Sequence, residues 1–267
     1  MTTVTAWSAE RRITRSGRPR LWWEIAIVLG LSLGASAIYS IIDIIARATE
    51  KTPLADQTAQ VNPSQSPREW LDFTYQFLGN AFPLFAVALV VYLLWERERT
   101  GFRRIGLDLT GPARDLGGGM LLFLVIGVPG ILFYAAGRLI GVTVEVQASP
   151  LDTHWWTVPI LVFAAIRAGL QEEVIIVGYL FTRLRQLGWG TWPIILGAAV
   201  LRGSYHLYQG FGPFAGNAIM GVVFGWCYTR WGRVAPLVVA HVVIDIVSFV
   251  GYPLAVALWP GVFGPRH

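Results

Sequence analysis

Cysteine and lysine are almost absent from this chain of 267 residues, and charge of either sign is sparse. Cys227 is the only cysteine, which excludes a disulfide framework and a cluster of thiolate metal ligands. It lies in an apolar segment, where we expect a buried packing thiol. Charged residues make up 14% of the sequence and hydrophobic residues 54%. Because soluble domains average roughly 25% charged residues, this composition excludes an ordinary soluble domain.

Basic residues exceed acidic ones, and nearly all of them are arginine. Lys51 is the only lysine among 21 basic residues, and the formal net charge is +5. A nucleic-acid surface would show a basic stripe with interleaved aromatic residues, whereas these arginines flank apolar segments. We therefore expect membrane lipids as partners and no nucleic acid.

Long apolar segments recur along the whole chain. Backbone polar groups in lipid must be satisfied within the segment that crosses it, so such segments are expected to be helices. The sequence predicts an all-α, polytopic transmembrane helix bundle with seven to eight membrane helices, forming a single membrane domain at 21–264. The predicted spans are residues 21–46, 69–95, 116–141, 155–182, 191–208, 212–230 and 234–252, and 253–264 forms a half-span or an eighth segment.

Arginine clusters alternate with arginine-poor connections. Residues 1–20 are basic and precede an apolar run too long for a signal peptide, so they form a predicted cytoplasmic tail. The later inside connections carry the same excess: Arg97, Arg99, Arg103, Arg104 and Arg114, then Arg183 and Arg185, then Arg230 and Arg233. The sequence thus predicts an integral membrane protein with a cytoplasmic N-terminus, and the arginine bias and compact length indicate a bacterial plasma membrane. The polar outside connection at 48–68 is expected to be a solvated linker, with a lid as the alternative.

Several ionisable residues lie inside the predicted spans. An ionisable residue at the middle of a membrane helix costs about 2.5–3.5 kcal/mol, so it usually marks a function and has a nearby partner. Residues four apart share a helix face, whereas adjacent ones are about 100° apart. One of the two adjacent glutamates can therefore face a cavity while the other braces a neighbouring helix. These residues are Arg167, Glu172 and Glu173 in the fourth span, Arg202 and His206 in the fifth, and His241 and Asp245 in the seventh.

This set has the chemistry for hydrolysis. A glutamate can act as general base towards a water, and imidazoles can bind a metal or can position the water and stabilise an oxyanion. The carboxylates outnumber the two arginines by one, and either a proton or a zinc–hydroxide unit would neutralise the remaining negative charge. We expect Arg167 to extend towards the membrane surface or to pair with a carboxylate.

Three motifs in this region resemble the CPBP family of membrane proteins, which contains the type II CAAX prenyl endopeptidases and Abi-type proteases. The family pattern is E-E-x-x-x-R, F-x-x-x-H and H-x-x-x-(N/D) on separate membrane helices. The chain has "EEVIIV", "RGSYH" and "HVVID" in the same order, over a family-like catalytic core at 155–252.

The resemblance implies a role for each motif residue. Glu172 would activate water, with His206 as its partner, and Glu173 would orient the site. His241 and Asp245 would hold the water and the oxyanion. Alternatively, a zinc ion or another divalent metal would be bound by His206, His241, Glu172 and Asp245.

Two positions depart from the family pattern. Val177 stands where the family has arginine, and Arg202 stands where it has phenylalanine. Our hypothesis is that Arg202 supplies the missing cation to Glu173 from the neighbouring helix. If nothing compensates for Val177, the chain would be an inactive member of the family.

Three functions stay open. The first is an intramembrane protease of the glutamate or metallo-endopeptidase type, which hydrolyses a peptide bond of a CAAX-like or other lipid-anchored, membrane-associated protein or peptide. The second is an inactive membrane scaffold or bacteriocin-immunity-type protein of the same family. The third is a small transporter with a proton relay, although such transporters usually have repeated broken helices, which this sequence lacks.

Overall fold

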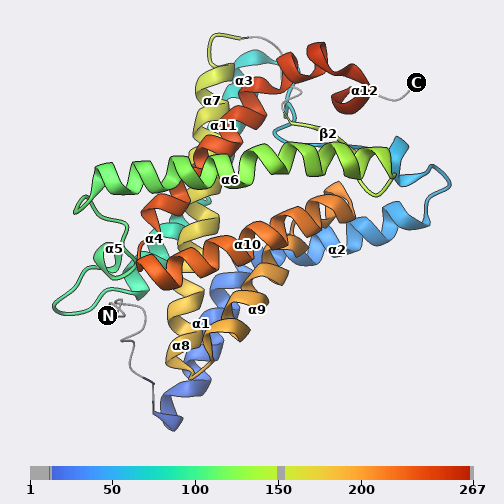
Figure 1. The fold of residues 1–267 in the computed structure, drawn as a ribbon. Helices are drawn as coiled ribbons and strands as arrows, with labels where there is room; N and C mark the ends of the chain where they lie inside the picture. The colour runs from blue at the N-terminus through green and yellow to red at the C-terminus, as the bar shows by residue number, and fades with distance from the viewer. Residues whose placement is uncertain (1–11, 13, 149–153, 265–267) are drawn as a thin grey trace.

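The computed structural model describes residues 12, 14–148 and 154–264, most of which are helical (Figure 1). The α-helices are α1 (Arg18–Gly30), α2 (Leu33–Thr49), α3 (Glu69–Ala81), α4 (Leu84–Leu93), α5 (Gly101–Arg104), α6 (Pro112–Leu139), α7 (Thr157–Glu172), α8 (Phe181–Gln186), α9 (Thr191–Ser204), α10 (Phe211–Trp231), α11 (Ala235–Leu258) and α12 (Pro260–Phe263). Short 3-10 turns are η1 (Arg15–Gly17), η2 (Leu54–Asp56) and η4 (Leu207–Gln209), and η3 (Glu173–Leu180) is a π-helix.

Helices form at each predicted span, but several are interrupted. Among the described residues, three helical stretches are long and apolar enough to cross a membrane: Glu69–Leu93, Pro112–Leu139 and Ala235–Leu258. A fourth is added if α1 and α2, bent by 58° at their junction, count as one span. Helix α9, with 14 residues, is only about 21 Å long, against a hydrocarbon core of about 30 Å. The count of seven to eight spans therefore stays a prediction.

The ends of the chain differ from the predicted segments. Residues 1–11 and 13 of the predicted tail lie outside the described residues. The tail was predicted to reach residue 20, which is wrong, because α1 already begins at Arg18. At the other end, residues 253–258 continue α11, and α12 adds only four residues, so no separate eighth helix forms within 253–264.

Tryptophans mark the two ends of the helix bundle. Trp155 and Trp70 stand at the start of α7 and α3, and Trp259 follows α11. These elements meet at the top of Figure 1, and all three side chains are exposed. Trp22 and Trp189 contact each other near α8 at the opposite end. Other exposed indoles lie away from these ends, among them Trp95 after α4 and Trp226 within α10, so the tryptophans form no simple pair of belts.

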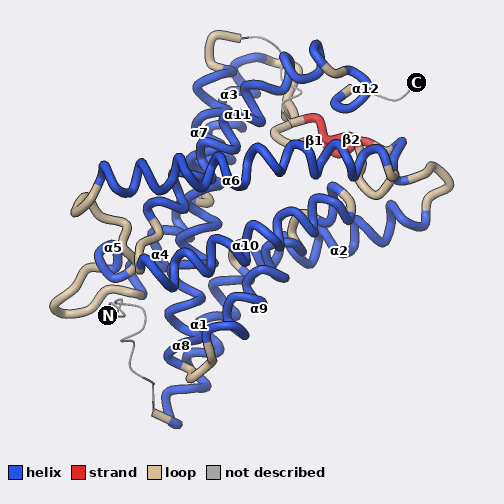
Figure 2. The backbone as a smooth tube through the Cα atoms, in the orientation of Figure 1, coloured by secondary structure: helices blue, strands red, loops and turns tan. Residues whose placement is uncertain are grey.

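The connection at 48–68 is not the solvated linker that we expected. Strand β1 (Thr58–Gln60) pairs in parallel with β2 (Glu145–Gln147), beside one end of α6 (Figure 2). We call residues 53–61 and 140–147 the cap. Thr143 of the cap forms a bridge with Gly210, and the Val144 N–H donates to the Gln209 carbonyl. The all-α expectation thus misses a small sheet, which lies against the segment that follows His206.

Ion pairs between Arg233 and two aspartates fix the start of α11. The Arg233 guanidinium donates to Asp115 Oδ1 at 2.8 Å and to Asp108 Oδ1 at 3.0 Å. Burial alone would raise the pKa of Asp108, but hydrogen bonds from Thr110 and Arg233 outweigh it, and the pKa lies below its usual value. Asp108 therefore stays charged at neutral pH, and the bonds of Arg233 to Asp108 and Asp115 anchor the helix that leads into the candidate site.

The continuous run α7–η3–α8 passes through the centre of the molecule (Figure 1). Helix α11 packs against its first part and α9 against its second. Helices α9 and α10 approach closely at Gly221, which has no Cβ; a Cβ there would lie 2.9 Å from the Ala199 Cα. Cys227 on α10 is free and buried, as expected.

Candidate active site

The adjacent glutamates lie where the central helix changes its winding. Glu172 is the last residue of α7 and Glu173 is the first residue of the π-helix η3. Such π-helical turns are rare and often occur at functional sites. Gly169, one turn earlier, allows α11 to approach, because a Cβ there would lie 2.7 Å from Val242 Cγ2. The close approach brings His241 beside Glu173.

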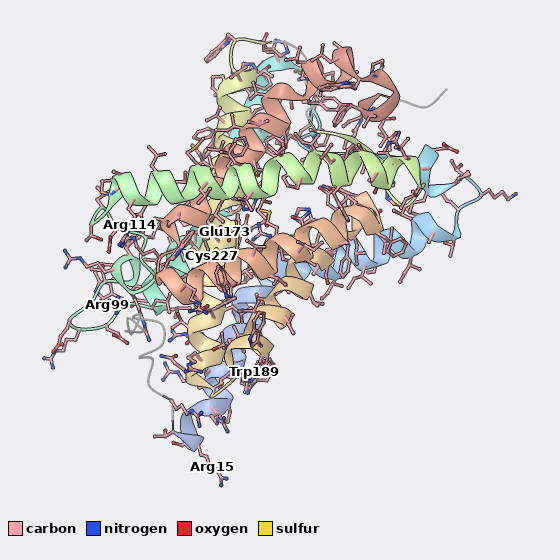
Figure 3. The ribbon with its side chains drawn as sticks, in the orientation of Figure 1. Arg15, Arg99, Arg114, Glu173, Trp189 and Cys227 are labelled. Carbon is pink, nitrogen blue, oxygen red and sulfur yellow. The ribbon has the colours of Figure 1, made fainter. Side chains whose placement is uncertain are left out.

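Glu173 is the buried, bracing carboxylate of the pair. Figure 3 places it in the interior of the molecule, and its exposed fraction is 0%. Arg202 Nη1 donates to its Oε1 at 2.7 Å, and His241 Nδ1 lies 2.7 Å from the same oxygen. Arg202 Nη2 also lies 3.1 Å from His241 Nδ1. A ring nitrogen that donates to the carboxylate has no lone pair for the arginine, so this last pair is a contact rather than a second hydrogen bond.

Arg202 occupies the position that our hypothesis requires. It is 1% exposed and comes from α9, across from the family arginine position now held by the buried Val177. Its guanidinium also stacks over the Phe224 ring, 5.4 Å from the ring centroid. The cation is therefore held on several sides beside Glu173.

Glu172 shares the Arg202 cation with Glu173 but keeps one oxygen free of described donors. Its Oε2 accepts a hydrogen bond from Tyr205 Oη at 2.7 Å, and Arg202 Nη2 lies 3.4 Å from the same atom. No described residue donates to Oε1, and the side chain keeps an exposed fraction of 10%. The two glutamates thus differ in their partners: Glu173 is bound by Arg202 and His241, whereas Glu172 is bound by Tyr205 and keeps an open oxygen.

His206 faces Glu172 from outside a helix. The fifth predicted span reached residue 208, but α9 ends at Ser204 and η4 follows His206. The Tyr208 N–H donates to Ser40 Oγ on α2, so α2 and the cap together hold this turn in place. His206 Nε2 lies 3.9 Å from Glu172 Oε2, and both of its ring nitrogens are buried without a hydrogen-bond partner in the structure.

Asp245 completes the group from α11. It lies one turn after His241, with its Oδ2 3.6 Å from His241 Nε2, which is too long for a hydrogen bond. All six residues of the predicted set, Glu172, Glu173, Arg202, His206, His241 and Asp245, therefore meet in one region. Arg167 is the exception, since its hydrogen bonds go to the side-chain oxygens of Asn80 and Gln171 instead of to a carboxylate.

The arrangement does not favour a metal site. Among the described residues, no group of three or more His, Cys, Asp and Glu side chains is placed to hold a metal ion. His241 Nδ1 faces Glu173, and the Arg202 cation lies 3.4 Å from Glu172 Oε2, where it would repel a divalent ion. Binding of zinc by His206, His241, Glu172 and Asp245 stays a prediction that this donor set does not support, and the steps proposed below use no metal.

Sequence reasoning missed Tyr205 and a row of polar residues on α3. Tyr205 stands directly before His206, and its phenol is the nearest donor to Glu172. The α3 residues Asp72, Gln76 and Asn80 are all buried and spaced four apart within a predicted span. That spacing was the available signal for a polar helix face.

Comparison with known proteins agrees with the motifs. Residues 154–247, less than half of the chain, match the family model "Type II CAAX prenyl endopeptidase Rce1-like". The match includes all six residues of the site. Searches of curated proteins and of solved structures found no match. The region at 154–247 therefore belongs to the Rce1-like type II CAAX prenyl endopeptidase family.

Proposed function

We propose that this chain is an intramembrane endopeptidase in which Glu172 activates a water for attack on a peptide bond. The observation that carries the proposal is that Glu172 Oε1 accepts from no described residue, while His206, whose Nε2 lies 3.9 Å from Glu172 Oε2, has no described hydrogen-bond partner for either ring nitrogen. A glutamate and a histidine with open hydrogen-bonding positions, held by buried neighbours, can bind one water and orient it.

The reaction needs one base that later acts as an acid. Glu172 takes a proton from the water while the resulting hydroxide adds to the substrate carbonyl carbon. The negative charge that develops on the carbonyl oxygen is stabilised by a ring N–H of His206. The carbon–nitrogen bond then breaks, and Glu172 returns its proton to the leaving amine. The products are a carboxylic acid and an amine, and Glu172 is again ionised.

The second carboxylate and its partners keep the first in place. Arg202 neutralises Glu173 at 2.7 Å and balances part of the charge of Glu172 at 3.4 Å. On α11, His241 lies between Glu173 and Asp245, with its Nε2 3.6 Å from Asp245 Oδ2. The substrate in this proposal is a membrane-associated protein or peptide, CAAX-like or otherwise lipid-anchored. The host membrane is a bacterial plasma membrane crossed seven or eight times, with the N-terminus in the cytoplasm.

The deciding experiment compares new peptide termini in membranes from cells that express either the wild type or Glu172→Ala at matched levels. Termini that occur only with the wild type are the expected result, and they would name the substrates. If both membranes yield the same termini while the variant is equally abundant and heat-stable, the hydrolase proposal is wrong and the scaffold function takes its place.

Loss of the Tyr205 hydroxyl is expected to slow turnover without unfolding the protein. The Tyr205 hydroxyl fixes the orientation of Glu172, and misplacement of a catalytic group by about 1 Å can cost about 100-fold, so Tyr205→Phe should lower kcat by about 10–100-fold and leave KM nearly unchanged. Tyr179→Phe is the matched control, since its hydroxyl also donates to a glutamate, Glu24, but outside the site. Equal kcat values for the two variants would contradict a role for Tyr205.

A further inference from the structure

Helix α3 carries a row of buried polar side chains, the last of which reaches α7. Asp72, Gln76 and Asn80 are each less than 10% exposed. Gln76 Nε2 donates to Asp72 Oδ1 at 3.4 Å, and Asn80 Nδ2 donates to the Gln76 carbonyl at 2.9 Å. The hydrogen bonds orient the free carbonyl oxygen of the Asn80 amide towards α7. The row therefore ends in an acceptor that meets Arg167.

Arg167 is a cation on a predicted membrane helix, and no described carboxylate pairs with it. Its Nε donates to Asn80 Oδ1 at 3.3 Å and its Nη1 donates to Gln171 Oε1 at 3.4 Å, and both acceptors are neutral amides. No described carboxylate lies within 4.0 Å of it, and the neighbouring Glu172 and Glu173 are paired with Arg202 instead. A cation in this setting normally has an anionic partner.

The guanidinium keeps unused N–H donors for such a partner. Nη2 makes no hydrogen bond to the described residues, and Nη1 uses only one of its two N–H groups. These unused N–H groups are donors that a carboxylate can accept, and a guanidinium commonly binds a carboxylate with two of them. The amides of Asn80 and Gln171 hold the opposite side of the group and leave its charge unneutralised.

The position of Arg167 relates it to the candidate active site. It precedes Glu172 by five residues on α7, a rise of about 7.5 Å along the helix. A group bound at Arg167 would therefore lie within a few residues of a peptide bond placed at Glu172.

We infer that Arg167, held by Asn80 and Gln171, binds a carboxylate of the peptide substrate. The inference rests on the proposed function, because it names the group by which the substrate is held. The carboxylate comes from the C-terminus of the substrate or from an acidic side chain near the cleaved bond. Either source supplies the missing negative charge, and the bound peptide then has one fixed direction across the site.

The test measures binding, so it does not depend on turnover. The purified full-length chain in detergent is titrated with three probes: acetyl-Leu-Leu-Leu as the free acid, the same peptide as its C-terminal amide, and acetyl-Leu-Asp-Leu as the amide. Wild type, Arg167→Gln and Arg167→Lys are compared. The control is Arg47→Gln, which removes one positive charge from an arginine whose partner is Asp43.

The wild type and Arg47→Gln are expected to bind the free acid about 10–100-fold more tightly than the leucine amide. Arg167→Gln should bind both with equal affinity, and Arg167→Lys should keep a reduced preference because an ammonium lacks the planar fork. Tight binding of the aspartate amide as well would identify a side-chain carboxylate as a source, and its absence would identify the C-terminus.

The inference is overturned if the wild type binds the free acid and the leucine amide equally. It is also overturned if a heat-stable Arg167→Gln variant keeps the wild-type preference for the free acid, or if none of the three probes binds. The proposed function fails separately. A preference for the acid without wild-type-specific termini in membranes would leave a carboxylate-binding protein that is not a protease. Such termini without any preference would leave the protease and remove only the role of Arg167.

Discussion

Replacing Glu172 with glutamine is expected to lower kcat by at least about 100-fold while the protein remains folded. A positioned general base typically contributes 10²–10⁴-fold to a rate, and an amide cannot take the proton from water. The fold should tolerate the change because the amide oxygen still accepts from Tyr205 and because Arg202 keeps its closer partner, Glu173, at 2.7 Å.

The matched variant is Glu173→Gln, which changes the neighbouring carboxylate by the same atoms. Glu173 faces two donors and has no exposed surface, so its neutralisation leaves Arg202 as a buried cation with a weaker partner. We expect this variant to lose stability first and activity as a consequence. Purified proteins are compared by kcat on the substrate found in membranes and by thermal midpoint in detergent. A Glu172→Gln enzyme that turns over at the wild-type rate would remove Glu172 from the mechanism.

Removing the Arg202 cation is expected to have the largest effect on stability. Arg202→Met keeps much of the volume but leaves Glu173 and Glu172 without the charge that lies 2.7 Å and 3.4 Å from them. Breaking a buried ion pair on one side costs about 3–5 kcal/mol, because the remaining charge stays buried and unpaired. The thermal midpoint of the purified protein should fall steeply, and activity should be lost even at temperatures where the variant is folded.

A double variant can show whether the cation beside Glu173 can come from position 177 instead of position 202. Val177→Arg with Arg202→Phe restores the residues of the family pattern at both positions. Val177 is buried on η3, one turn from Glu173, so an arginine there can reach the same carboxylate. We expect the double variant to be more stable than Arg202→Phe alone. If it is no more stable than that single change, Arg202 does more than replace the family arginine.

Hydropathy predicted the helices well because long apolar runs have few other structures available in a membrane. It could not predict where they break. The bend between α1 and α2 falls within a uniformly apolar segment, and α9 ends at Ser204 because Tyr208 and Gly210 bond to other parts of the chain. The strands of the cap have three residues each, too few for a periodic signal, and they pair only because distant segments meet.

The charged part of the site was predictable for a different reason. A carboxylate or guanidinium in a membrane segment is expensive, so Glu172, Arg202 and their partners stand out in the sequence. Asn80 and Tyr205 do not, because neutral amides and phenols are common in membrane helices and at interfaces. Only contacts between helices show that these neutral groups hold the charged ones.

The separation of Glu173 and Arg202 in the sequence bears on how the protein is made. The two residues are 29 positions apart, so the carboxylates leave the ribosome before their counter-charge exists. At a synthesis rate of about 5–20 residues per second, this interval is roughly 1.5–6 s. During this interval, release of α7 alone into lipid would be unfavourable, because its carboxylates would have no counter-charge. Insertion of α7 should therefore wait for α9, and the two helices should leave the insertion machinery as a pair, with the ion pair already formed.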